Sequence, residues 1–144
     1  MSKYNKHILL SILILFHLSA GKIISSPYDG KLNKRVNVEK IIGSNGEIGD
    51  VLIDGVTTIR FYAGSGNESP YNRALAAGVI ISQSMNEGTI GAETIILDKF
   101  EKRICVKIKG VVIACADDDA KFLRKKPIKL ADEWVCKLRS VIAE

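Results

Sequence analysis

The chain has 144 residues, of which 47% are hydrophobic and 26% are charged. This length supports one domain with a real core and excludes two domains. The formal net charge is +5, from 21 Lys and Arg against 16 Asp and Glu. These basic residues are scattered, apart from the cluster Arg124-Lys125-Lys126, whereas a nucleic-acid binder normally gathers them on one face with aromatic side chains. We therefore predict no nucleic-acid partner.

Residues 1–26 have the pattern of a secretory signal peptide. Lys3 and Lys6 precede an apolar run from Ile8 to Phe16, and small residues follow it. The run is shorter than the roughly 20 residues of a membrane-spanning helix. We predict cleavage after residue 20 or 26 and a periplasmic or secreted protein, which would be anchored to the membrane only if the signal stayed uncleaved. Loss of 1–26 would leave 18 basic residues against 16 acidic ones.

The two histidines, His7 and His17, both lie in this predicted signal. The exported form would then lack the commonest general base and metal ligand. The three cysteines are an odd number, and their spacings of 10 and 21 residues match no zinc motif. We predict no metal site, no cofactor and no catalytic residues.

The next segment, 27–48, is rich in polar and turn-forming residues, and we predict a polar tether. A single domain is expected over 49–144. It begins with two strands, 51–53 and 57–63, around Asp54-Gly55, a dipeptide suited to a tight hairpin turn. In the second strand Thr58, Arg60 and Tyr62 alternate with apolar residues, so they are expected to face water.

Ser69-Pro70 predicts the start of a helix over 70–85, because Ser accepts a hydrogen bond from the first turn and Pro suits its first position. Leu75, Val79 and one of Ile80 or Ile81 are expected to form its buried stripe.

Three strands are predicted next, over 93–98, 103–108 and 111–116. A two-residue turn at Lys109-Gly110 would pair Ile104 with Cys115 and bury Cys115. Cys105 would then face the opposite side, so the two cysteines should not bond to each other.

Asp117 to Asp119 predict a single helical turn, capped by Asp118 or Asp119. The last helix, 128–143, carries an apolar stripe with Trp134 as its core anchor, and Cys136 lies away from it. The stripe comprises Ala131, Trp134, Val135, Leu138 and Ile142. The element order ββαβββα predicts an α+β fold, with an antiparallel sheet of about five strands covered on one face by two helices.

Four short motifs carry a family resemblance. They are Val51-Leu52-Ile53-Asp54-Gly55, Ser69-Pro70-x-x-Arg73-Ala74, Asp119-Ala120 and Leu130-Ala131-x-x-Trp134. Over about residues 49–143 the chain resembles an uncharacterised extracytoplasmic α+β domain. That domain occurs ahead of mechanosensitive-channel-type membrane regions in bacterial envelope proteins, and in small exported proteins. The resemblance implies an accessory or sensing module and assigns no catalytic residues. Because the sequence ends at Glu144 without a transmembrane segment, we expect no channel activity.

Three functions remain open at this stage. The first is a non-enzymatic envelope or periplasmic domain that binds a protein or another envelope component, with Arg60, Tyr62 and Arg73 as candidate binding residues. The second is a small carboxylate-dependent hydrolase using two acids in close proximity, which would draw on Glu68, Asp117 and Asp118. The third is a small-ligand carrier that uses the uncovered face of the sheet. The residues expected on that face are Arg60, Tyr62, Arg103, Cys105 and Lys107.

Overall fold

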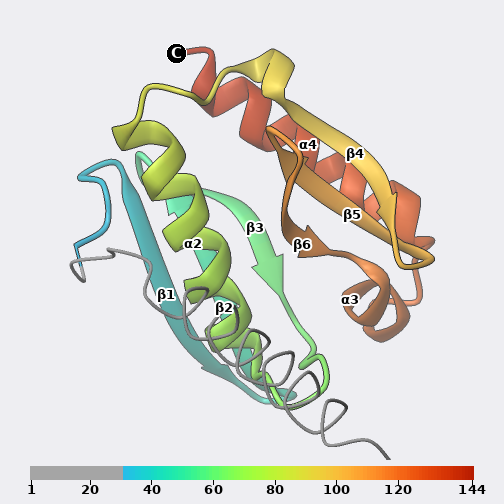
Figure 1. The fold of residues 1–144 in the computed structure, drawn as a ribbon. Helices are drawn as coiled ribbons and strands as arrows, with labels where there is room; N and C mark the ends of the chain where they lie inside the picture. The colour runs from blue at the N-terminus through green and yellow to red at the C-terminus, as the bar shows by residue number, and fades with distance from the viewer. Residues whose placement is uncertain (1–30) are drawn as a thin grey trace, which may run out of the picture. The chain divides into compact units, whose positions relative to one another are not determined.

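The computed structural model describes residues 31–144, of which Leu32–Glu144 form one unit (Figure 1). The predicted signal peptide, 1–26, and the start of the predicted tether lie outside the described residues. The α+β class is confirmed. Within 31–144 there are two antiparallel three-stranded sheets and three α-helices, so the prediction of a single five-stranded sheet with two helices is wrong in detail.

The first sheet has the order β1-β2-β3, formed by Val36–Gly43, Gly46–Ile53 and Val56–Phe61. Strand β1 and the start of β2 lie within 36–48, which the sequence analysis assigned to the tether. The reason is that β1 is an edge strand: Val36 is buried, while Asn37 and Glu39 face outward between the valines and give the segment its polar composition. The predicted Asp54-Gly55 turn is confirmed by the positive φ angles of both residues.

Helix α2, Pro70–Asn86, lies along this sheet (Figure 1). Its predicted cap is confirmed, since the Ser69 side chain accepts a hydrogen bond from the Asn72 amide. Its predicted stripe is correct only at Ile81, which is fully buried; Leu75 is 36% exposed and Val79 is half-buried. The buried residues of α2 are mostly small, namely Arg73, Ala74, Ala77, Gly78, Ile81 and Ser82. Small residues are needed because the helix lies so close to the sheet that a Cβ added at Gly78 would be 2.5 Å from Val38 Cγ2.

The second sheet follows a short 3₁₀ turn, Ala92–Thr94, and has the order β4-β5-β6. Its strands are Ile95–Phe100, Arg103–Ile108 and Val111–Cys115. The Lys109-Gly110 turn and the pairing of Ile108 with Val111 are as predicted.

The rest of the β5–β6 register differs from the prediction by one residue. A bulge at Ile113 leaves that residue without a cross-strand partner, and Cys105 rather than Ile104 then pairs with Cys115. The two cysteines form a disulfide, with Cα atoms 3.9 Å apart. Both predictions about them are therefore wrong: they bond to each other, and Cys105 is the buried member while Cys115 is half-buried.

Helices α3, Asp117–Phe122, and α4, Pro127–Ile142, complete the chain. Trp134 of α4 is 3% exposed and its ring centroid lies 5.6 Å from that of Phe61, which confirms it as a core residue. Val141 is buried where Ile142 was expected. Cys136 is exposed, as predicted, and forms no disulfide within 31–144. None of the helices in this range is long and apolar enough to cross a bilayer.

Candidate functional site

Arg73 and Asp119 form a buried ion pair between α2 and α3. Arg73 Nη1 lies 2.8 Å from Asp119 Oδ2, and the two side chains are 6% and 0% exposed. The Arg73 guanidinium also lies 4.4 Å from the Phe61 ring centroid and donates to the carbonyl oxygens of Ala63 and Cys115. Arg73, predicted as a binding residue, is thus placed inside the fold, where it ties the end of β3 to the end of β6.

Asp119 holds the chain just after β3. Its Oδ1 accepts hydrogen bonds from the amides of Tyr62, at 2.6 Å, and Ala63, at 3.0 Å. The side chain therefore does not cap α3, and the predicted capping role is wrong: Ala116 occupies the cap position, without a side-chain hydrogen bond. This buried network therefore holds the backbone from which the Tyr62 ring projects.

Arg60 lies on the face of the first sheet that α2 leaves uncovered. It donates two hydrogen bonds to Asp50 on β2, of 2.7 and 2.5 Å, and Asp50 is only 1% exposed. The hydrogen bonds to the Asp50 carboxylate raise the pKa of the Arg60 guanidinium above its ordinary value. Arg60 stays about one-third exposed, so it can present charge at the surface while neutralising a buried acid.

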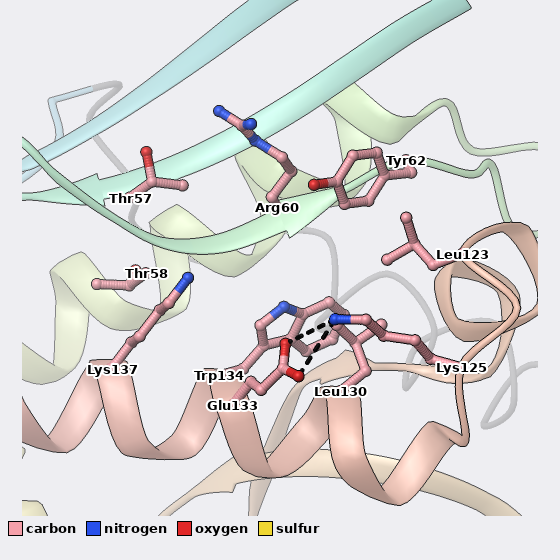
Figure 2. Close-up of a pocket in the computed structure, with 10 residues that line it drawn as sticks. All are labelled: Thr57, Thr58, Arg60, Tyr62, Leu123, Lys125, Leu130, Glu133, Trp134 and Lys137. Carbon is pink, nitrogen blue, oxygen red and sulfur yellow. Dashed lines mark hydrogen bonds and ion pairs between the residues drawn. The ribbon is translucent and has the colours of Figure 1, made fainter. Parts of the chain in front are cut away.

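A polar cavity of about 190 Å³ lies between β3 and α4 (Figure 2). Its β3 wall exists because of a second bulge: Thr58 has no partner on β2, so Thr57 and Thr58 both line the cavity. Thr58 is 1% exposed and donates to the Val51 carbonyl oxygen, which contradicts its predicted exposure to water. The lining residues are Thr57, Thr58, Arg60, Tyr62, Leu123, Lys125, Leu130, Glu133, Trp134 and Lys137.

Three cations and one acid line this cavity. Lys125 reaches both oxygens of Glu133 at 3.2 Å, and Arg60 is paired with Asp50. Lys137 lines the same cavity and makes no ion pair within the described part of the chain (Figure 2). The cavity that Trp134 lines is therefore also lined by a positive charge without an ion-pair partner in the described residues.

An apolar cavity of about 270 Å³ lies on the other side of Tyr62. One wall is the turn between β1 and β2, residues 43–48, and the other is Phe122 and Leu123 at the end of α3. The rings of Tyr62 and Phe122 are stacked, with centroids 5.9 Å apart and planes at 15°. Tyr62 and Leu123 line both cavities, so an apolar site and a cationic site are contiguous.

The three acids considered for hydrolysis, Glu68, Asp117 and Asp118, do not form a pair of carboxylates that face each other across one cavity. Arg103 Nη2 lies 2.6 Å from Asp118 Oδ2, and Asp117 Oδ2 accepts from the Ile104 amide and is also near Arg103. Glu68 lines a different, more open cavity of about 160 Å³ with Arg73 and Arg103, and neither Asp117 nor Asp118 lines it.

The residues predicted to form one uncovered face for a small ligand do not lie on the same sheet. Arg60, on β3, and Tyr62, just after β3, do line the same cavity. Cys105 is buried in the disulfide, while Lys107 and Arg103 are on the second sheet and pair with Asp98 and Asp118.

Sequence reasoning missed Phe122, Lys125 and Lys137. The only signal for them was the basic cluster at 124–126, which was interpreted as a solvated loop. Within 31–144 no group of three or more His, Cys, Asp or Glu side chains is placed to hold a metal ion. No protein-family model, curated protein sequence or solved structure matches this chain.

Proposed function

We propose that this protein is an exported, non-enzymatic binding domain of the cell envelope that recognises its partner through the Tyr62 surface. We define this surface as Tyr62, Phe122, Leu123 and the two cavities that these residues join. The observation that carries the proposal is the position of Tyr62, which stacks on Phe122 and lines an apolar cavity on one side and a cationic cavity on the other. An aromatic side chain between an apolar and a charged subsite is typical of binding surfaces.

The arrangement of the acids favours binding over hydrolysis. A carboxylate general acid works through a pKa raised by an apolar environment or a second acid. Here Asp117 and Asp118 both face Arg103, and Glu68 lines another cavity. The accessory or sensing role implied by the family resemblance is consistent with a binding domain.

The test is recovery of envelope partners with a tagged chain expressed in its native host. We expect Tyr62→Ser to lose most of the recovered partner, because it removes both the stack on Phe122 and the wall shared by the cavities. The matched control is Val111→Ser, at an exposed apolar position on the second sheet. If the two variants recover partner equally, while both melt like wild type, the Tyr62 surface is not the binding site.

A second candidate function, small-ligand carriage, is favoured by the unpaired charge of Lys137 in a cavity beside Trp134. Trp134 is the single tryptophan of the chain, so its fluorescence reports directly on this cavity. Titration with acetate and with inorganic phosphate would test for a small anion. We expect Lys137→Gln to abolish any change in fluorescence, and Lys129→Gln, an exposed change on the same helix, to leave it intact. No fluorescence change in wild type would remove this candidate.

A further inference from the structure

We propose that the partner of the Tyr62 surface is the anionic surface of a lipid bilayer, contacted by the β1–β2 turn and by residues 120–137 of α3, α4 and their connection. This inference rests on the proposed function and names the partner. It is an association with the membrane surface, in which side chains enter the headgroup region while the backbone stays in water.

Apolar side chains project from both parts of this surface. Ile42, beside the β1–β2 turn, is 73% exposed, and Phe122, at the end of α3, is 47% exposed. The apolar cavity between the turn and α3 brings these two parts together. Ile128, in the first turn of α4, is 53% exposed. Ile42 adjoins in sequence the turn that lines this cavity, and Phe122 lines it, so exposed large apolar side chains accompany an apolar cavity, as is typical of interaction surfaces.

The charge around these residues is strongly positive. Residues 120–137 contain six basic residues, Lys121, Arg124, Lys125, Lys126, Lys129 and Lys137, against only Asp132 and Glu133. Of the three acids just before this segment, Asp119 is paired with Arg73, while Asp117 and Asp118 share Arg103, so these acids and arginines together leave only one negative charge. The segment therefore keeps a net positive charge, although the domain as a whole is nearly balanced.

Basic residues interspersed with Phe and Ile are the pattern of surfaces that bind anionic membranes. The cations are attracted to the lipid headgroups, and the apolar side chains insert at the boundary of the acyl chains. Arg124, with a positive φ angle of 55°, directs the chain sharply between α3 and α4, so the cations are presented on a tight connection rather than on a long loop.

The experiment is sedimentation of the purified chain with vesicles of phosphatidylglycerol and phosphatidylcholine, compared with vesicles of phosphatidylcholine alone. We expect binding only to the anionic vesicles, falling steeply as salt is raised from 50 to 500 mM, roughly as surface charges become screened. Phe122→Ser should weaken binding roughly tenfold or more, because it removes a large buried apolar area from the bound state. Val111→Ser should not.

A charge-matched pair of variants tests the electrostatic part. Arg124→Gln with Lys126→Gln removes two exposed cations from the proposed surface, and Lys34→Gln with Lys109→Gln removes two from elsewhere. Only the first pair should reduce binding to anionic vesicles. All variants carry the same N-terminal segment, so its contribution cancels in each comparison, and thermal melting checks that each variant is folded.

Three outcomes would overturn the inference. They are equal binding to both kinds of vesicle, equal effects of the matched variants, and binding of soluble poly-glutamate without binding of anionic vesicles, which would assign the surface to an acidic protein. If vesicles do not bind but a protein partner is still recovered in a Tyr62-dependent way, the inference fails and the proposed function stands. If Tyr62→Ser changes neither vesicle binding nor partner recovery, the proposed function itself is wrong.

Discussion

The domain has two halves, the first sheet with α2 and the second sheet with α4, and each half buries its helix in a different way. Helix α2 contacts the first sheet through Ala74, Ala77 and Gly78, and its backbone comes close to the strands. Helix α4 contacts the second sheet and β3 through large side chains, among them Leu130, Trp134 and Leu138. Enlarging a side chain should destabilise the helix that is packed closely through small residues. Truncating a side chain should destabilise the helix that is packed through large ones.

The junction between the halves differs from both, because it is polar and buried. Arg73 of α2 and Asp119 of α3 join the end of β3 to the end of β6, and the same Asp119 fixes the backbone at Tyr62. The Tyr62 surface thus sits directly on the junction of the two halves. Stability and binding should therefore respond to different substitutions: those at the junction and in the two helices affect folding, and those at exposed residues of the surface affect binding.

The largest effect is expected at the junction. Asp119→Ala leaves the Arg73 guanidinium buried without its acid and removes the acceptor for two backbone amides. Removing one partner of a buried ion pair typically lowers the free energy of unfolding by about 3–5 kcal/mol, which is a large share of a small domain's stability. Urea denaturation would measure the loss, with Asp132→Ala at an exposed position of α4 as the control. A loss below about 1 kcal/mol would mean that the halves are not joined here.

Truncation of the large-residue helix should come next. Trp134→Ala removes a ring that is 3% exposed and packs against Phe61. We expect destabilisation of about 3–5 kcal/mol, from lost burial and the cavity left behind. Cys136→Ala, exposed on the same helix, should change the melting temperature little. If Trp134→Ala melts within a degree or two of wild type, α4 is wrongly placed.

A smaller but more discriminating effect is expected in the small-residue helix. Gly78→Ala places a methyl group against Val38, and such overpacking costs about 1–3 kcal/mol, partly offset by the better helix propensity of Ala. Leu75→Ala should cost less, because Leu75 is 36% exposed. Thermal melting of both variants ranks them. If Leu75→Ala melted at a lower temperature than Gly78→Ala, Leu75 would be a buried residue of α2, as the sequence predicted.

The smallest effect is a pH dependence at the β1–β2 turn. Hydrogen bonds from Lys40, Ser69 and the Tyr71 amide lower the pKa of Glu47 from 4.5 to about 2. A carboxyl whose pKa is lowered by folding stabilises the native state above its unfolded pKa and loses that contribution as the pH falls toward the folded pKa. Melting temperatures measured from pH 6 to pH 2 should therefore fall more for wild type below about pH 4.5 than for Glu47→Gln. Parallel curves would show that Glu47 does not link the turn to α2.

The parts of the fold that the sequence predicted correctly are those with a strong local signal. The Asp54-Gly55 turn, the Ser69-Pro70 helix start and Trp134 in the last helix were predicted from single motifs or from large apolar residues at helical spacing. Apart from Ile81, the buried face of α2 was not predicted, because most of it consists of small residues that carry little hydrophobic signal. The β5–β6 pairing was missed because a one-residue bulge changes every later pairing and leaves no mark in the local composition.

The candidate site was predictable only in part, for a similar reason. Arg60, on β3, and Tyr62, just after its end, lie on the same side because they are two residues apart in extended chain, and alternation is visible in a sequence. Phe122, Lys125 and Lys137 reach the same place from α3 and α4, about 60 to 75 residues further on. Nothing local connects them to Tyr62, and only the fold of the two halves brings them together.

The central claim is that the Tyr62 surface binds the partner while the rest of the domain supports it. The most direct measurement is the change in backbone amide NMR shifts when small bicelles containing phosphatidylglycerol are added to the protein. The account predicts that the largest changes fall at Ile42, at Tyr62 and from Phe122 to Ile128, while the exposed strand residues Val56, at the start of β3, and Val111, at the start of β6, stay unchanged. Shifts centred on Val56 or Val111, or spread evenly over both sheets, would contradict it.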